Sequence, residues 1–317
     1  MVKKSLNKIS PLAPKGIKRL SPVEGVSLYT YCANLYNKQR NDLSVFLFHN
    51  KSFIAEVFTK SSLRSATLDW NSQALKGKEV QAIVVNSGNA NTFTGKQGEI
   101  AIEEVVKTIA SQFKVSKKKI FVASTGVIGE PFPTQKVIKA IKEKKSPSKN
   151  WIDAARSIMT TDTYPKGISI NTSIGKQKIR ITGIAKGSGM IEPNMATMLG
   201  FIFTDAELSQ SILRSLISKF IPDSFNSISV DGDESTNDTV ILTSTNAKKL
   251  NKKIHSINDK RLKKFKLDLE KVFLYLAEQI VRDGEGATKL IEVNVTNARS
   301  RLSAEKISRS IANSPLI

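Results

Sequence analysis

Histidine and cysteine are scarce in this chain: its 317 residues include two histidines, His49 and His255, and one cysteine, Cys32. A single cysteine excludes an internal disulfide, and no Cys/His cluster has the spacing of a metal site. Neither histidine stands beside a nucleophile motif, which disfavours Ser-His-Asp and Cys-His catalysis. The scarcity of cysteine fits a reducing compartment, and we predict a cytoplasmic protein.

Long apolar runs are also missing. The runs at residues 80–85 and 198–203 are far shorter than the about 20 residues that a helix needs to span a bilayer. The first lysines are followed by prolines and polar residues rather than by the apolar core of a secretory signal. We therefore expect no secretory signal and no membrane segment.

Acidic residues are few relative to basic ones, with 28 Asp and Glu against 49 Lys and Arg, and the formal net charge is +21. A field of this sign attracts polyanions at low salt. The densest basic runs, at residues 117–119, 142–149 and 248–266, contain few aromatic residues, and no zinc-finger, helix-turn-helix or RNA-recognition pattern accompanies them. We predict a solvated basic surface, with nucleic-acid binding as the weaker alternative.

Short β-branched or aromatic segments alternate with segments of helical periodicity along the whole chain. Strands are predicted at residues 44–48, 53–58, 80–85, 120–123, 178–184, 198–203, 227–230, 239–242 and 289–295. Helices are predicted at residues 100–113, 133–141, 151–159, 208–220, 262–281 and 304–311. The periodicity indicates a mixed α/β fold without internal repeats.

The most informative pattern lies in residues 183–205 (GIAKGSGMIEPNMATMLGFIFTD). A glycine-rich turn brings the Ala196–Thr197 bond to the start of an apolar strand, where a bend can strain that peptide and expose the Thr197 hydroxyl. The pattern predicts self-cleavage that leaves Thr197 as an N-terminal nucleophile. On the residues alone, a flexible turn followed by a threonine at a strand edge explains the segment equally well.

A threonine at a new amino terminus can act as nucleophile and base together. Its α-amino group has a pKa of about 7.7–8.0 and lies within reach of its own hydroxyl oxygen. The hydroxyl can then take an acyl group and pass it to a second substrate. The same hydroxyl can first attack the carbonyl carbon of Ala196 in an N-to-O acyl shift, so that cleavage and catalysis share one geometry.

Further motifs occur in a fixed order along the chain: residues 83–91 (IVVNSGNAN), 122–129 (VASTGVIG), 158–166 (IMTTDTYPK), 229–240 (SVDGDESTNDTV) and 280–289 (IVRDGEGATK). Together with residues 183–205, they resemble the ornithine acetyltransferase (glutamate N-acetyltransferase) family of arginine biosynthesis. The precursor of that family is cut before the threonine of its Ala-Thr-Met-Leu motif. Two departures are mild: Gly200 replaces the usual alanine, and Glu234 the usual threonine.

The resemblance implies a reaction and a set of site residues. The family moves acetyl from N2-acetylornithine to glutamate through an acetyl-threonine, needs no metal or organic cofactor, and in some members also uses acetyl-coenzyme A. Carried over to this sequence, the nucleophile is Thr197, the oxyanion hole is Thr125 with Gly126, and the substrate contacts are Thr160, Lys186, Thr197 and Glu285. Thr161 and Thr163 stay open as neighbouring contacts.

The resemblance also implies a layered fold of two sheets between helical layers, the α-β-β-α arrangement typical of N-terminal-nucleophile enzymes. Residues 1–196 are then the α fragment and residues 197–317 the β fragment, interwoven in one body, with two copies of each in a heterotetramer. Beyond the part that resembles residues 298–317, the family continues through an Asp-Pro-Asn-Trp-Gly-Arg segment to a substrate-binding asparagine and threonine. This sequence lacks that segment, so we expect it to match only part of the family's length.

Two alternatives of other classes remain open. An N-terminal-nucleophile aminopeptidase or amidohydrolase would pass its acyl group to water, and an inactive, truncated basic binding protein would carry out no transfer. The Ala-Thr-Met-Leu sequence at residues 196–199, together with Lys186 and Glu285, favours the transferase.

Overall fold

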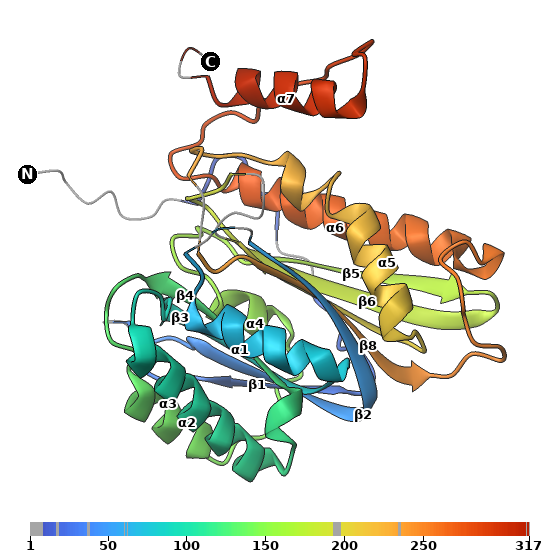
Figure 1. The fold of residues 1–317 in the computed structure, drawn as a ribbon. Helices are drawn as coiled ribbons and strands as arrows, with labels where there is room; N and C mark the ends of the chain where they lie inside the picture. The colour runs from blue at the N-terminus through green and yellow to red at the C-terminus, as the bar shows by residue number, and fades with distance from the viewer. Residues whose placement is uncertain are drawn as a thin grey trace, which may run out of the picture.

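The computed structural model describes residues 9–16, 19–36, 39–59, 61, 63–192, 198–233, 236–314 and 316. Within these residues, one long strand, β2 (Leu43–Phe58), joins the two halves of a twisted eight-stranded sheet (Figure 1). The first part of β2 pairs antiparallel with β1 (Val26–Tyr31) and β3 (Glu79–Asn89), and β4 (Ile120–Val127) pairs parallel with β3. The last part of β2 pairs antiparallel with β8 (Thr239–Lys248).

The second half of the sheet mixes strands from both sides of residue 197. The parallel pair of β7 (Leu199–Ala206) and β8 lies between β2 and β6 (Gln177–Lys186), and β5 (Lys166–Ile174) forms the outer edge. The chain before residue 197 and the chain after it therefore share one sheet.

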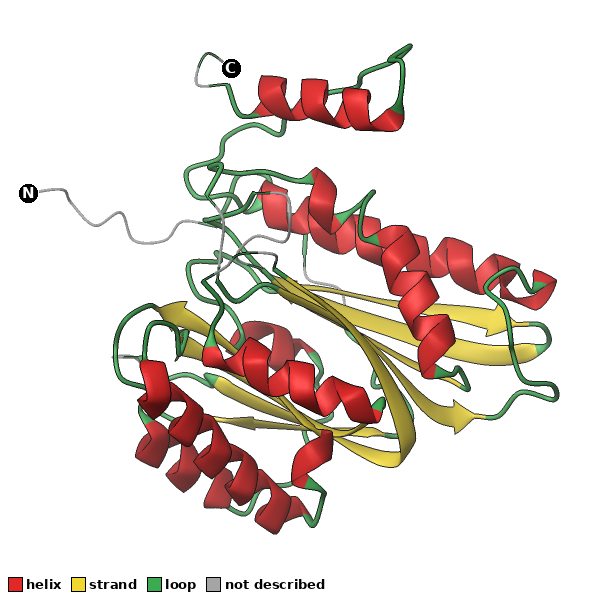
Figure 2. Cartoon of the chain, viewed as in Figure 1, coloured by secondary structure: helices red, strands yellow, loops and turns green. Residues whose placement is uncertain are grey.

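Helices cover the outer faces of both halves (Figure 2). The β1–β4 half carries α1 (Ala66–Ala74), α2 (Gly95–Phe113) and α3 (Thr134–Lys142). The other half carries α5 (Gln210–Phe220) and α6 (Lys263–Arg282), while α4 (Ile152–Ser157) packs with the apolar layer between the two halves.

Side-chain alternation explains the layers, because successive residues of a strand point to opposite faces. In β3, Val84 faces the helices and Val85 the interior between the half-sheets; in β7, Ile202 and Phe203 divide in the same way. The interior holds packed aromatic rings, with the Phe46 and Phe203 centroids 4.7 Å apart. These apolar layers confirm the predicted α-β-β-α class, in which the two sheets are continuous through β2.

Two predicted strands are wrong. Residues 289–295 alternate in polarity but form an exposed, irregular segment, because no strand among the described residues runs beside them to accept their hydrogen bonds. Residues 227–230 begin with the last residue of the short 3-10 helix Phe225–Ser227, and the Val230 N–H donates to the Ile191 carbonyl instead of to a strand. The sequence analysis also missed β1, β5 and α1, whose patterns are weak.

Helix α7 (Arg301–Ala312), predicted at residues 304–311, lies apart from the layers (Figure 1), and none of its residues is buried. Its contacts with the body are polar, for example from the Arg309 guanidinium to the Asn226 carbonyl at 3.2 Å. Of the helices in the described part of the chain, none is both long and apolar enough to cross a membrane.

Candidate active site

Thr125 and Gly126 lie at the carboxyl end of β4, paired in register with Ser87 and Gly88 of β3. The Thr125 side chain is buried. Gly126 has a φ of +133°, and a Cβ at this position would lie 2.3 Å from the Gly88 carbonyl carbon. Only glycine fits there, since both the backbone conformation and the close approach of β3 exclude a side chain.

A buried amide holds this strand end to the chain that follows residue 197. The Asn237 side-chain nitrogen donates to the Ser124 carbonyl at 2.9 Å and to the Ala90 carbonyl at 2.6 Å. Its oxygen accepts from the hydroxyls of Thr92 and Thr236, each at 2.6 Å. Because a buried amide is costly unless its donors and acceptors are used, this arrangement holds the Thr125–Gly126 segment firmly.

The predicted cleavage residues, Ala196 and Thr197, lie outside the described residues. Met198 is the next described residue, and its N–H donates to the Asp238 carboxylate at 3.0 Å. The next residue, Leu199, pairs with Thr239 in β8. The residue that follows Thr197 in the sequence is therefore anchored directly beside Asn237, the amide that holds the end of β4.

Lys186 is the last residue of β6 and is almost completely buried. Burial lowers the pKa of its ammonium, while the carboxylates of Asp162 and Asp238 act in the opposite direction. Its register partner is Leu199 in β7. Lys186 therefore lies close to the start of the chain that follows Thr197.

Thr160 is half-buried in the loop after α4. Its N–H donates to the Asp162 carboxylate at 3.0 Å. The preceding carbonyl, of Met159, accepts from the Arg40 guanidinium at 2.6 Å and from the Tyr36 hydroxyl at 3.3 Å. The ring of Tyr36 also lies against Gly88, because a Cβ added at Gly88 would come within 3.1 Å of it. Tyr36 thus links the Thr160 loop to the β3–β4 end.

Glu285 lies in the turn after α6 and is exposed. Its N–H donates to the Ser188 carbonyl at 2.9 Å. Its carboxylate lies over Gly189, where an added Cβ would come within 2.7 Å of a carboxylate oxygen. The turn after α6 therefore packs on the glycine-rich turn that follows Lys186.

The structure thus brings together, where the carboxyl end of β4 meets the starts of β7 and β8, the segments that carry Thr125, Gly126, Thr160, Lys186 and Glu285. The sequence analysis missed Asp162, Asn237 and Asp238, which connect these segments. All three stand inside motifs quoted for the family, yet each binds a distant partner: Asp162 binds Gly187, 25 positions away, Asp238 binds Met198, 40 positions away, and Asn237 binds Ser124, 113 positions away. Among the described residues, no group of three His, Cys, Asp or Glu side chains is arranged to hold a metal ion.

Asp231, in the motif at residues 229–240, binds the glycine-rich turn. Its carboxylate accepts the N–H groups of Met190 and Ile191, at 2.5 Å and 2.9 Å. Met190 has a φ of +56°, uncommon for a residue with a side chain. Asp231 therefore fixes the conformation of the glycine-rich turn at Met190 and Ile191.

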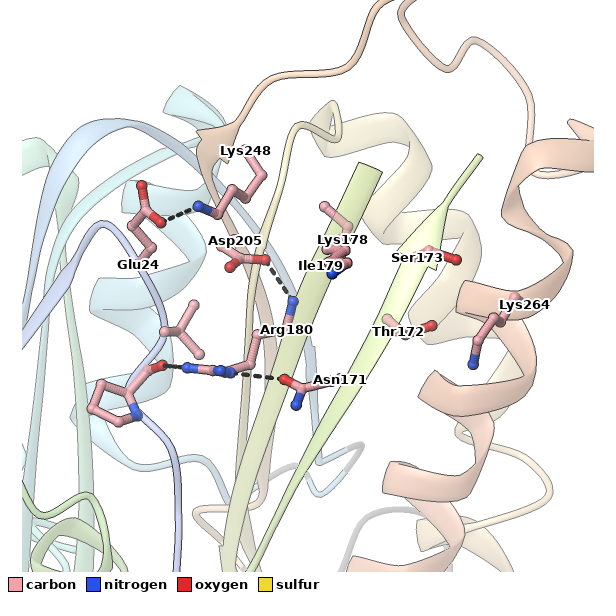
Figure 3. Close-up of a pocket in the computed structure, with 12 residues that line it drawn as sticks. Glu24, Asn171, Thr172, Ser173, Lys178, Ile179, Arg180, Asp205, Lys248 and Lys264 are labelled. Atoms are coloured by element: carbon pink, nitrogen blue, oxygen red, sulfur yellow. Dashed lines mark hydrogen bonds and ion pairs between the residues drawn. The ribbon is translucent and has the colours of Figure 1, made fainter. Parts of the chain in front are cut away.

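A hollow of about 670 Å³ lies at the other end of β5 and β6 (Figure 3). Arg180, which lines it, is six residues from Lys186, or about 20 Å along a strand. The Arg180 guanidinium is engaged by the Pro22 carbonyl and the Asn171 side chain, each at 3.1 Å, and Lys248 forms an ion pair with Glu24. Because these cations are already partnered, the hollow is a weaker candidate for chemistry than the opposite end.

Residues 28–317 match the model of the ArgJ family. The arginine biosynthesis bifunctional protein ArgJ of Bradyrhizobium diazoefficiens is 44% identical over 314 residues, which are 98% of this chain and 76% of that protein. The protein of the same name from Agrobacterium fabrum is 44% identical over 313 residues, with the same shares covered.

Solved structures show the same architecture. A crystal structure of ArgJ from Bacillus halodurans matches 56% of this chain and 95% of its own, with a TM-score of 0.53 and 31% identity. The L-aminopeptidase D-Ala-esterase/amidase of Ochrobactrum anthropi, described as a variant of the Ntn hydrolase fold, covers 86% of this chain and 88% of its own. Its TM-score is 0.51 and its identity 13%, so this likeness concerns the fold alone.

These findings confirm the family predicted from the motifs and, with it, the prediction of an acyltransferase of arginine biosynthesis. The relatives are longer than the part that matches, as expected from the motifs that this sequence lacks. The chain belongs to the ArgJ family.

Proposed function

We propose that the protein moves acetyl from N2-acetylornithine to glutamate through an acetyl ester on Thr197, after it has cleaved itself between Ala196 and Thr197. One observation carries this proposal: the Asn237–Asp238 pair bonds both to the Thr125–Gly126 strand end and to Met198, the neighbour of Thr197. An N-terminal nucleophile must lie near its oxyanion hole, and this pair ties the two segments together.

Cleavage begins when the Thr197 hydroxyl oxygen attacks the carbonyl carbon of Ala196. The Ala196–Thr197 peptide bond breaks, an ester forms, and the nitrogen takes the proton of the hydroxyl. Water then hydrolyses the ester, which leaves a carboxylate on Ala196 and a free hydroxyl and amino group on Thr197. The products are an α fragment of residues 1–196 and a β fragment of residues 197–317.

Transfer uses the freed amino group as the base. It takes the hydroxyl proton while the Thr197 oxygen attacks the acetyl carbonyl of N2-acetylornithine, and the Thr125 hydroxyl and Gly126 N–H donate to the oxyanion. The C–N bond breaks, ornithine leaves with the proton, and acetyl remains on Thr197. The amine of glutamate then attacks this ester, giving N-acetylglutamate and the free hydroxyl.

The remaining predicted residues hold the amino-acid part of the substrates. The exposed Glu285 carboxylate suits a substrate ammonium, and the Lys186 ammonium suits a carboxylate. Thr160 supplies a hydroxyl from the adjoining loop. We extend the proposal to acetyl-coenzyme A as a second donor, since the relatives are named bifunctional, and to a cytoplasmic assembly with two copies of each fragment.

Intact-mass spectrometry tests the proposal in two steps. The purified protein is expected to appear as two fragments, the second beginning at Thr197, and this fragment gains the mass of one acetyl group on addition of N2-acetylornithine. Thr197→Ala is expected to abolish both events because it removes the attacking oxygen. Thr108→Ala, which removes an exposed hydroxyl on α2, is the matched control.

A Thr197→Ala protein that still breaks at residue 196, or still exchanges acetyl, would contradict the proposal. Addition of glutamate should discharge the acetyl fragment faster than water does. Discharge that is equally fast without glutamate would instead identify an amidohydrolase. Native mass spectrometry of the cleaved protein measures the proposed two-plus-two assembly.

A further inference from the structure

Three charged side chains are completely buried beside the candidate site: Asp162, Lys166 and Asp283. The Lys166 ammonium lies 2.6 Å from a carboxylate oxygen of Asp162 and 2.5 Å from one of Asp283. Buried charges cost several kcal/mol each unless well-aligned partners surround them. The proposed mechanism uses none of the three, so their presence calls for another task.

The Asp162 carboxylate accepts hydrogen bonds from two main-chain segments. One oxygen accepts from the Lys166 ammonium and from the Gly187 N–H at 2.8 Å. The other accepts from the Thr160 N–H at 3.0 Å. Burial alone would raise the pKa of Asp162, but the charges of Lys166 and Lys186 outweigh it and hold the pKa below its usual value. Asp162 is therefore an anion that joins the Thr160 loop to the glycine-rich turn.

Asp283 joins the same cluster to a third segment. Its carboxylate accepts the Thr163 N–H at 2.9 Å and the Thr163 hydroxyl, besides the Lys166 ammonium. Its carbonyl accepts the Ser188 hydroxyl at 2.5 Å, and two residues later the Glu285 N–H donates to the Ser188 carbonyl. The position of the Glu285 turn therefore depends on Asp283 and on the turn after Lys186.

We propose that Asp162 is a positioning residue of the substrate site and that Lys166 and Asp283 extend its hold to the Glu285 turn. The three segments that carry the predicted substrate contacts then form one unit instead of three independent loops. The inference rests on the proposed function only because N2-acetylornithine and ornithine are the ligands that test it. Positioning of this kind matters because a displacement of about 1 Å can cost about 100-fold in rate.

Asp162→Asn isolates this task because asparagine has nearly the same shape. Its single oxygen can serve the Lys166 and Gly187 donors or the Thr160 N–H, but its NH2 group must then face the donor that remains. One of the two main-chain segments therefore loses its anchor. The matched control is Asp205→Asn, since Asp205 is also buried and accepts a main-chain N–H, from Arg180 at 2.7 Å, at the other end of β6.

The experiment measures KM and kcat for N2-acetylornithine in the self-cleaved proteins. Asp162→Asn is expected to raise KM about tenfold or more with a smaller change in kcat, whereas Asp205→Asn keeps wild-type values. A KM within twofold of the control would overturn the inference. Calorimetric titration with ornithine compares the Kd of the same variants and needs no activity. If the protein transfers no acetyl group, the proposed function is refuted, but the Kd values still test the role of Asp162.

Thr163→Val provides a second variant that keeps the buried ions and removes one hydroxyl from Asp283. It is expected to fold and to raise KM about threefold, in the same direction as Asp162→Asn. An unchanged KM would contradict the link from the cluster to the Glu285 turn. The double variant Asp162→Asn/Thr163→Val should lose less than the product of the single effects, because both changes act on one network.

Discussion

Strand β6 ends in two different electrostatic environments. At its carboxyl end, Lys186 is buried beside Asp162, whose other partners are Lys166 and two main-chain N–H groups. Near its amino end, Arg180 lines an open hollow (Figure 3), where it binds a carbonyl and an amide. Charges at the carboxyl end of β6 are buried and are balanced by each other. Charges near its amino end can exchange a protein partner for water.

A large hollow is a poor guide to chemistry in this protein. A hydrated lysine or arginine can lose its partner at little cost, because water replaces it. A buried ion or dipole cannot replace its partner with water. Preorganised groups stabilise the charge of a transition state best where water is excluded in this way.

Lys166→Met should give the largest loss of stability. It leaves the carboxylates of Asp162 and Asp283 buried without their shared cation, which typically costs about 3–5 kcal/mol of unfolding free energy. Lys248→Ala, which removes the exposed ion pair with Glu24 at the hollow, should leave the urea midpoint unchanged. Equal midpoints for the two variants would show that the buried cluster contributes nothing.

Gly126→Ala should come next, with a loss of activity larger than its loss of stability. A Cβ there would lie 2.3 Å from the backbone of β3 at a φ that favours glycine, so the proposed oxyanion donor must move. Loss of one such donor lowers kcat about 100-fold. Gly77→Ala is the control, since a Cβ at Gly77 meets nothing within 4 Å. Acetylation of the Thr197 fragment at an unchanged rate would exclude Gly126 as a donor.

The smallest expected effect is a difference between Asp162 and Asp205 in how the free energy of unfolding depends on pH. The lowered pKa of Asp162 gives stability that is present above its unfolded value, about 3.9, and is lost as pH falls through the folded value. The cost of Asp162→Asn should therefore shrink below about pH 4. Burial raises the pKa of Asp205, so the wild-type protein gains from that site on acidification. Urea unfolding of both Asn variants from pH 7 to pH 3 measures the difference, and parallel curves would contradict it.

Local patterns predicted much of the fold. The helix expected at residues 100–113 lies within α2, and the strand expected at residues 80–85 lies within β3, because apolar periodicity reflects burial on one or both faces. The weak strands β1 and β5 form because neighbours pair with them. Residues 289–295 have the alternation of a strand but no such neighbour among the described residues, so the same reasoning failed there.

The site divides in a similar way. The resemblance to the family identified Thr125, Gly126, Thr160, Lys186 and Glu285 as candidates, and contacts through Asn237, Asp238 and Asp162 bring their segments together. Spacing could not reveal that Lys186 is buried between Asp162 and Asp238. A side chain's desolvation depends on everything packed around it, including segments more than a hundred positions away.

Residue types and their order thus determined the family, the α/β class and the prediction of a threonine rather than a histidine nucleophile, because these depend on which chemical groups are present and on local periodicity. Tertiary structure alone decided that β2 joins two half-sheets, that Asn237 and Asp238 tie Met198 to the end of β4, and that Asp162, Lys166 and Asp283 form one buried cluster. Such contacts arise only when folding brings distant segments together and removes the water between them. Local sequence patterns do not show which distant segments will meet.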